Sequence, residues 1–294
     1  IKTGRLDVAA QQGIELIQVY FDRQDDQRAL EMLSHIAEID PLNIERRISL
    51  ARLVHVNGRE QVAFQEFLLL ASKLFGENRW EDSLRVCNAG LELFQDDARL
   101  RDLMGRALLK LGRKSEAIQV QLHLAAIHDE RGEEAKAQRV YETILEDQPD
   151  DQATLEAMVD WALRHDRYGL AVDHLVRLAE NHYVAGALDR AIDAMERIQT
   201  IDPGRLDLKA RLAEIYLEQG DENGACATWL ATARALAIAG RHDAAIEIHE
   251  KTLALRPENI EIIEALTEAY AGAGRDEDHQ RQALVLGERL KEEG

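Results

Sequence analysis

Ten histidines are the residues of this sequence best suited to metal chemistry. The closest pairs are spaced by five, seven and eight residues: His123 with His128, His242 with His249, and His174 with His182. Two histidines that hold zinc from one face of a helix are four residues apart, so these spacings do not match that motif. No Cys-x-x-Cys motif adds thiolate ligands. We therefore expect solvated or capping histidines and no metal site.

Motifs for other chemistry are also missing from the sequence. It contains no glycine-rich phosphate-binding loop and no Gly-x-Ser-x-Gly nucleophile motif. Adjacent carboxylates such as Glu133 with Glu134, and Asp150 with Asp151, fall where helices are expected to begin, and a helix dipole favours negative charge there. These features predict no catalytic residue, no cofactor and a protein that is not an enzyme.

A period of 54 residues organises the chain. The four prolines share one phase of it, and two further sets of positions carry glycine, asparagine or aspartate, residues that tolerate the left-handed conformation that ends helices. The prolines are Pro41, Pro149, Pro203 and Pro257, with Gln95 at the vacant phase. The helix ends are Gly58, Gly112, Asp166, Gly220 and Gly274 in one set, and Asn78, Gly132, Gly186 and Gly240 in another. Three stops in 54 residues predict three helices of about 15 residues in each copy.

Helix starts and small residues keep the same phase. Asn43, Asp97, Asp151 and Asn259 are expected N-caps, whereas Arg205 at the equivalent position is a poor one. Alanines recur at fixed positions and would let helix axes approach closely: Ala63, Ala117, Ala171 and Ala225 in one set, and Ala71, Ala125, Ala179 and Ala233 in the next. No stretch alternates with a period of two. The sequence predicts an all-α, right-handed α-solenoid of about 16 antiparallel helices.

The residues resemble the tetratricopeptide repeat (TPR) family. The segment 213–220, with Ala213, Tyr216 and Gly220, is similar to the end of that family's first helix, and 245–259 is similar to its second helix and closing proline. The resemblance covers the whole chain: a partial repeat 1–40, repeats 41–94, 95–148, 149–202 and 203–256, and a partial repeat 257–294, all in one solenoid. The family's usual unit has 34 residues and two helices. Here the middle helix either plays both roles, or the helices form three layers as in armadillo-type arrays.

The resemblance implies a binding face. In the family, the position after the small residue of the first helix often points into a groove that holds a peptide or helix. Here that position changes from basic to acidic along the chain: Arg52, Arg106, Asp160, Glu214 and Glu268. The alternative is an ordinary solvated stripe. Trp80, at a half-exposed position, is a further candidate partner contact or a helix-start staple, whereas Trp161 and Trp229 are expected in the core.

Composition narrows the choice of partner. The net charge of −19 disfavours nucleic acid and anionic membrane surfaces, and no run of 18 apolar residues suggests membrane insertion. Residues 1–20 do not resemble a signal peptide, and the chain begins and ends within a repeat, so we expect a fragment that lacks any upstream targeting segment. Cys87 and Cys226 are expected to be buried, reduced thiols in a cytoplasmic protein.

Two functions remain open on sequence alone. The first is a non-catalytic protein–protein interaction scaffold that binds a partner peptide, helix or subunit, with basic segments favoured by the acidic surface. Self-association through the open solenoid end, with Leu284, Leu286 and Leu290 unpaired, is part of this hypothesis. The alternative is the regulatory or substrate-recruiting arm of a multidomain enzyme whose catalytic domain lies outside residues 1–294.

Overall fold

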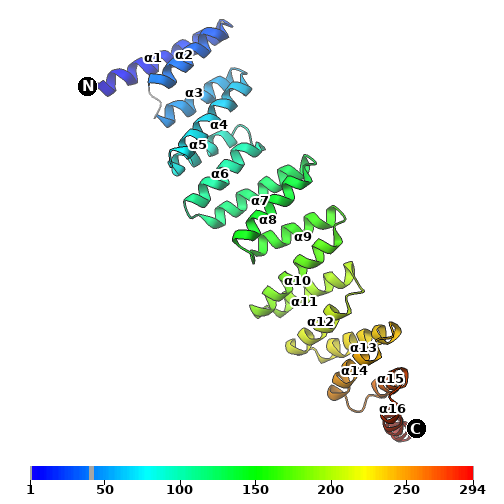
Figure 1. Cartoon of the computed structure of the whole chain (residues 1–294). Helices are drawn as coiled ribbons and strands as arrows, with labels where there is room; N and C mark the ends of the chain where they lie inside the picture. Colours follow the sequence, from blue (N-terminus) through cyan, green and yellow to red (C-terminus); the bar gives the residue numbers. More distant parts are fainter. Residues whose placement is uncertain (1, 40–42, 294) are drawn as a thin grey trace. The chain divides into compact units, whose positions relative to one another are not determined.

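The computed structural model describes residues 2–39 and 43–293, and within these ranges it contains sixteen α-helices and no strand (Figure 1). The chain divides into two compact units, Ile1–Asp147 and Gln148–Gly294. The helices of the first unit are α1 (Lys2–Asp22), α2 (Asp26–Ile39), α3 (Ile44–Val56), α4 (Glu60–Gly76), α5 (Trp80–Leu91), α6 (Ala98–Lys110), α7 (Lys114–Glu130) and α8 (Glu134–Asp147). Those of the second are α9 (Gln152–Arg164), α10 (Tyr168–Val184), α11 (Leu188–Ile201), α12 (Leu206–Gln219), α13 (Glu222–Ile238), α14 (His242–Leu255), α15 (Ile260–Gly272) and α16 (Asp276–Glu293).

Helix starts recur every 54 residues across both units. The first helices of the successive copies begin at residues 44, 98, 152, 206 and 260, the middle helices at 60, 114, 168, 222 and 276, and the third helices at 80, 134, 188 and 242. Pro41, the first proline of the expected period, lies outside the described residues. The all-α repeat architecture is therefore confirmed, while the assignment of residues 1–294 to one solenoid stays a prediction.

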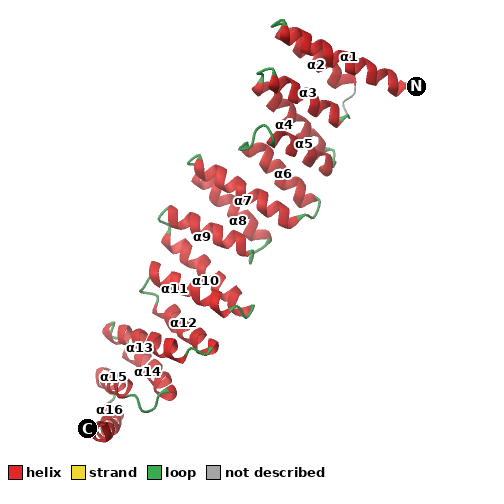
Figure 2. Cartoon of the chain, turned by 180° about the vertical axis from the view of Figure 1, so that it is seen from behind, coloured by secondary structure: helices red, strands yellow, loops and turns green. Residues whose placement is uncertain are grey.

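Helices end where the sequence predicts. The marker residues have positive φ, which forces the chain out of the right-handed helix: 78° at Gly58, 75° at Gly112, 61° at Asn78 and 55° at Asp166. Gln24 adopts the same conformation, with φ of 60°, at the first copy's equivalent of Asn78. Short loops follow these ends, and Figure 2 shows them as brief green connections between helices.

Helices also begin where caps were expected. The side chains of Asn43, Asp97, Asp151 and Asn259 accept hydrogen bonds from backbone N–H groups of the first helical turn. Such groups have no partner within the helix, so the cap satisfies them. Arg205 makes no side-chain cap at the start of α12, which confirms it as the weak start.

Small residues form the contacts between helices. The two recurring alanine sets have exposed fractions of 0%, and so do Ala29, Ser83, Ala137, Ala191 and Ala245 at a third position. Larger side chains fill the space around them, including the fully buried Trp161 and the nearly buried Trp229, as expected. Because burial of apolar surface is the main favourable term in folding, this repeated stripe holds each helix against its neighbours.

Each unit arranges its helices in two rows. Consecutive helices pack on one another, and because the loops between them are short, neighbours run antiparallel. Next-but-one helices also touch: α3 with α5 and α4 with α6 in the first unit, and α13 with α15 in the second. Odd-numbered and even-numbered helices therefore form opposite rows within a unit. These next-but-one contacts favour two layers over three.

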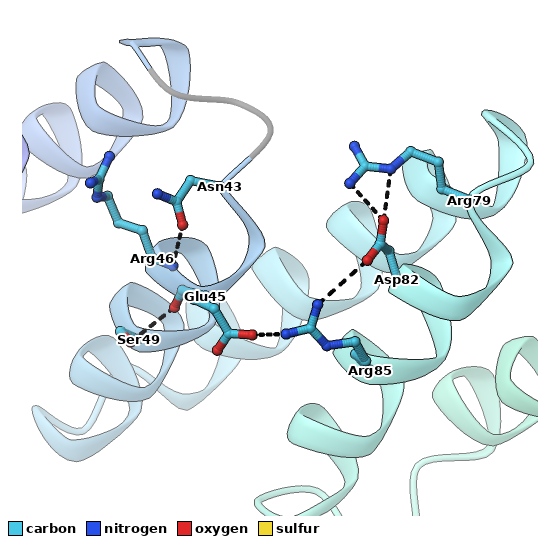
Figure 3. A network of polar contacts seen from close by, with 7 residues as sticks. All are labelled: Asn43, Glu45, Arg46, Ser49, Arg79, Asp82 and Arg85. Atoms are coloured by element: carbon cyan, nitrogen blue, oxygen red, sulfur yellow. Dashed lines mark hydrogen bonds and ion pairs between the residues drawn. The ribbon is translucent and has the colours of Figure 1, made fainter. Parts of the chain in front are cut away.

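An ion-pair network marks one such contact. Figure 3 shows Arg85 of α5 between Glu45 of α3 and Asp82 of its own helix, with Arg79 on the other side of Asp82. The Arg85 and Asp82 side chains are 3.5 Å apart, and Arg79 and Asp82 are 2.6 Å apart. Glu45 and Arg85 are more than half exposed, and exposed ion pairs contribute roughly 0–1 kcal/mol to folding stability. The network is therefore a consequence of the packing of α3 against α5 and adds little to its stability.

Candidate partner-binding grooves

Charged grooves lie between next-but-one helices in both units. Two helices of one row form the walls of each groove. Side chains of a third helix, which lies between the two in sequence or directly follows them, line its base. Concave sites of this kind are where partners and ligands most often bind. The grooves are the candidate functional sites of the protein.

The first unit carries a basic groove along α4, α6 and α8. It consists of two adjoining hollows, of about 280 Å³ between α4 and α6 and about 270 Å³ between α6 and α8, which share Asp102 and His128. Leucine and valine side chains contribute to its walls. The basic residues that line it are Arg99, Arg106, Lys136 and Arg139.

Local contacts hold most of these basic groups. Arg99 lies 3.0 Å from Asp97 and stacks over the ring of Phe64, and Arg106 lies 3.6 Å from Asp102. Lys136 pairs with Glu133 at 2.9 Å. The positive charge of the basic groove is thus partly neutralised by its surroundings, and an acidic ligand would compete with these pairs.

A groove of mixed charge lies between α9 and α11. It has a volume of about 410 Å³, with Glu156 and Asp193 opposed to Arg190 and Arg197. His182 contributes from α10 at its base. Because its charges balance, it offers no net preference for either sign of partner.

The second unit also carries an acidic groove between α13 and α15. This groove has a volume of about 550 Å³. Glu261, Glu264 and Glu268 line it from α15, and Arg234 faces them from α13. Arg234 forms an ion pair with Glu261, so one carboxylate is neutralised locally. The lining residues from the other elements are His242 and His249 of α14, with Ala237 and Ile238 at the end of α13.

His249 lies at the base of the acidic groove and is only 1% exposed. Its Nδ1 atom is buried and has no hydrogen-bond partner among the described residues. Burial, assisted by the positive charge of Arg234, lowers the pKa of His249 from 6.5 to about 4. The imidazole is therefore neutral at pH 7 and has one nitrogen able to accept a hydrogen bond.

The residues of the predicted polar stripe are divided between the rows. In the first unit Arg52 is on α3 and Arg106 on α6, helices of opposite rows. In the second unit Asp160, Glu214 and Glu268 are on α9, α12 and α15, so successive members again alternate between odd and even helices. The reason is that three helices per repeat in two rows exchange equivalent positions at each copy. Only Arg106 and Glu268 line the grooves described above.

Three other stripe residues make ion pairs instead. Arg52 lies 2.5 Å from Glu92 at the end of α5, and Asp160 lies 3.4 Å from Arg197. Glu214 pairs with Arg211 at 2.8 Å and with Lys251 at 3.5 Å. Trp80 is half-buried at the first position of α5, as expected. Partner contact by any of the five stripe residues or by Trp80 stays a prediction.

The histidine prediction was wrong for two residues. His174 and His249 are buried rather than solvated, with exposed fractions of 8% and 1%. A signal for His249 was present in the repeat register. Its equivalents in the other copies are all buried: Leu33, Cys87, Tyr141 and Met195. The sequence analysis missed this, as it also missed Glu264.

The cysteines and the chain end complete the sequence-predicted features. Cys87 and Cys226 are free and buried, as expected. At the end of the chain, Leu284 and Leu290 are 72% and 48% exposed, whereas Leu286 is half-buried. None of the helices in the described part of the chain has the length and apolar character needed to cross a membrane.

Comparison with known proteins gives structural likenesses of low similarity. No family model matches the chain, and no curated protein does. Among solved structures it is similar to MamA, at 17% identity over 78% of this chain and 94% of that one, with a TM-score of 0.21. It is similar to the human IFIT1 dimer with PPP-AAAA, at 14% identity over 97% and 84% of the two chains, with a TM-score of 0.29. It is also similar to the P58(IPK) TPR domain, at 15% identity over 99% and 89%, with a TM-score of 0.21.

These TM-scores lie below 0.5, so the likenesses carry no argument about function. The helices of this chain, their ends and their small-residue contacts define a repeat array of antiparallel helices.

Proposed function

We propose that this chain is a non-catalytic scaffold for protein–protein interaction that holds a peptide, helix or subunit of a partner in the grooves between next-but-one helices. The observation that carries the proposal is the acidic groove. It has a volume of about 550 Å³, is formed by the packing of the repeat helices, and is lined by three glutamates and one arginine. Repeat scaffolds commonly bind along surfaces of this kind because stacking leaves an extended face open.

The preferred partner carries basic segments. The chain has a net charge of −19, and the acidic groove concentrates three of its carboxylates on one helix. Opposite charges accelerate encounter and favour the correct partner over acidic competitors. The two free, buried cysteines support a reducing, cytoplasmic setting for this interaction.

Affinity capture tests the proposal. The whole chain is immobilised as bait in lysate from its source organism, with an unrelated protein of similar negative charge as control, and retained proteins are identified by mass spectrometry. We expect one or a few proteins in stoichiometric amount on the bait alone, with loss between roughly 0.05 and 0.5 M salt as screening increases. Retention equal to that on the control protein would contradict the scaffold, and salt-insensitive retention would contradict the basic-segment preference.

A further inference from the structure

The acidic groove lacks a counter-charge for two of its carboxylates. Arg234 pairs with Glu261, but Glu264 and Glu268 have no ion pair among the described residues. They lie four residues apart, on one face of α15, and like charges at this spacing destabilise a helix. A second cation in the groove would remove that repulsion.

His249 supplies a second and independent sign of a missing ligand. A buried polar atom without a hydrogen bond costs free energy, and the copies of this position in other repeats avoid the cost by holding Leu33, Cys87, Tyr141 or Met195. With its proton on Nε2, the neutral imidazole leaves Nδ1 as an acceptor without a partner within the described ranges, and His249 is among the residues that line the groove. A donor that enters the groove would satisfy it.

The groove chemistry favours a guanidinium group. The two carboxylates and the imidazole nitrogen are all acceptors, and a guanidinium offers five N–H donors in a planar fork that suits several acceptors at once. Ile238, 89% exposed, and Ala237 line the groove beside these acceptors and offer apolar contact to the aliphatic stem of an arginine. In the described part of the chain, no group of three or more His, Cys, Asp or Glu side chains is arranged to hold a metal ion.

We propose that the groove between α13 and α15 is a slot for an arginine side chain of the partner, held by Glu264 and Glu268 with Nδ1 of His249 as acceptor at the base. This rests on the proposed scaffold function and specifies the partner residue that the second unit recognises. The Arg234–Glu261 ion pair lies in the same groove, so Glu264 and Glu268 are the two carboxylates left for the added cation.

Peptide binding to the whole chain tests the slot. The probe is a fluorescein-labelled peptide, Gly-Ser-Gly-Arg-Gly-Ser-Gly-Arg-Gly-Ser. The comparison peptide carries citrulline, the uncharged isostere of arginine, at both arginine positions. We expect the arginine peptide to bind about tenfold more tightly than the citrulline peptide by fluorescence anisotropy, since charge-assisted hydrogen bonds are lost with the charge. Equal affinity for the two peptides would overturn the slot.

Matched variants separate the slot from general acidity. The double variant Glu264→Gln with Glu268→Gln is expected to lose about tenfold in affinity, corresponding to two weakened contacts. The control pair Glu180→Gln with Glu247→Gln removes the same charge from exposed positions of the same unit that do not line the groove, and less than about twofold loss is expected there. Equal losses in the two pairs would overturn the proposal, because binding would then follow net charge alone.

His249 variants test the acceptor. His249→Leu is expected to reduce affinity about threefold or more, and His249→Asn, whose amide oxygen can occupy the place of Nδ1, is expected to retain most of it. Circular dichroism melts verify that each variant is folded. If neither His249 variant changes affinity while the glutamate pair does, the acceptor role is wrong. A slot that fails these tests while affinity capture still retains a partner overturns the arginine assignment and leaves the scaffold in place.

Discussion

His249 places a polar side chain at a position that the repeat buries, and its Nδ1 atom has no hydrogen-bond partner there among the residues that the structure describes. Four other copies place an apolar or weakly polar side chain at this buried position, and only this copy places an imidazole there. A group that loses hydration without gaining a hydrogen bond is destabilising. Residues that are unfavourable for folding are often those with a role in binding. The buried imidazole therefore favours the acidic groove over the other grooves as a binding site.

The buried imidazole predicts a pH dependence of stability. The pKa of His249 is lowered to about 4 in the folded chain against 6.5 as its ordinary value, so between these limits the unfolded chain binds a proton that the folded chain does not. Its contribution to stability is complete above pH 6.5 and is lost as the pH falls toward 4. We expect His249→Leu to lose less unfolding free energy than the original chain between pH 7 and pH 5, measured by urea denaturation.

The exposed His123 provides the control for this prediction. His123→Gln changes a histidine that is already solvated, so its loss of stability between pH 7 and pH 5 should match that of the original chain. Arg234, His242 and the three glutamates line the same groove as His249, and they are unchanged in both variants. An equal pH dependence in the His249 and His123 variants would show that the buried imidazole does not titrate as described.

Helix starts are set at the scale of single elements by local hydrogen bonds. Asn259 accepts from the N–H of Ile262 at 3.1 Å, whereas Arg205 at the equivalent start makes no such bond. We expect Asn259→Ala to reduce the free energy of unfolding by about 1 kcal/mol and Arg205→Ala to change it by less than about 0.5 kcal/mol. Chemical denaturation of both variants measures the difference, and losses of similar size would contradict the capping role.

Helix ends depend on backbone conformation in the same local manner. Gly112 lies just after α6 with φ of 75°, and an added Cβ would meet no atom within 4 Å. The cost of a substitution there therefore comes only from holding an L-residue in the left-handed backbone conformation. We expect Gly112→Ala to cost about 1–2 kcal/mol of unfolding free energy. Gly76, the last residue of α4, is equally open but has no positive φ, and Gly76→Ala should be neutral or slightly stabilising. Thermal and urea unfolding of the two variants checks the contrast.

Stability is also local at the scale of the whole molecule. Each unit is a stack in which helices contact their near neighbours, so a defect should spread along the stack only within short range. Phe67, fully buried in a core formed by α3 to α6, is a suitable probe. We expect Phe67→Ala to cost about 3–5 kcal/mol locally and to reduce amide hydrogen-exchange protection in α3 to α6, with little change in α12 to α15.

Leu69 on the same helix gives the matched control. Its side chain is 63% exposed, so Leu69→Ala removes little buried surface and should leave exchange protection nearly unchanged throughout. If Phe67→Ala instead lowered protection equally in both units, the chain would unfold as one cooperative body and the picture of local stability would be wrong.

The repeat, the helix bounds and the buried alanines followed from the sequence alone. A left-handed residue such as Gly112, a cap such as Asn259 and a small residue such as Ala63 act through their own backbone or immediate neighbours, and the chain repeats them at fixed intervals. Local signals of this kind need no knowledge of distant contacts, and hence sixteen helices could be predicted before any packing was known.

Tertiary structure decided which side chains meet. The predicted stripe from Arg52 to Glu268 is regular in sequence, yet two rows of helices with three helices per repeat place its successive members on opposite rows. Conversely, Arg234, His249 and Glu264 have no common place in the repeat, and only the packing of α13, α14 and α15 brings them to one groove. Helix formation is local and follows from residue order, whereas a binding surface depends on which helices become neighbours, and that is a property of the packed array.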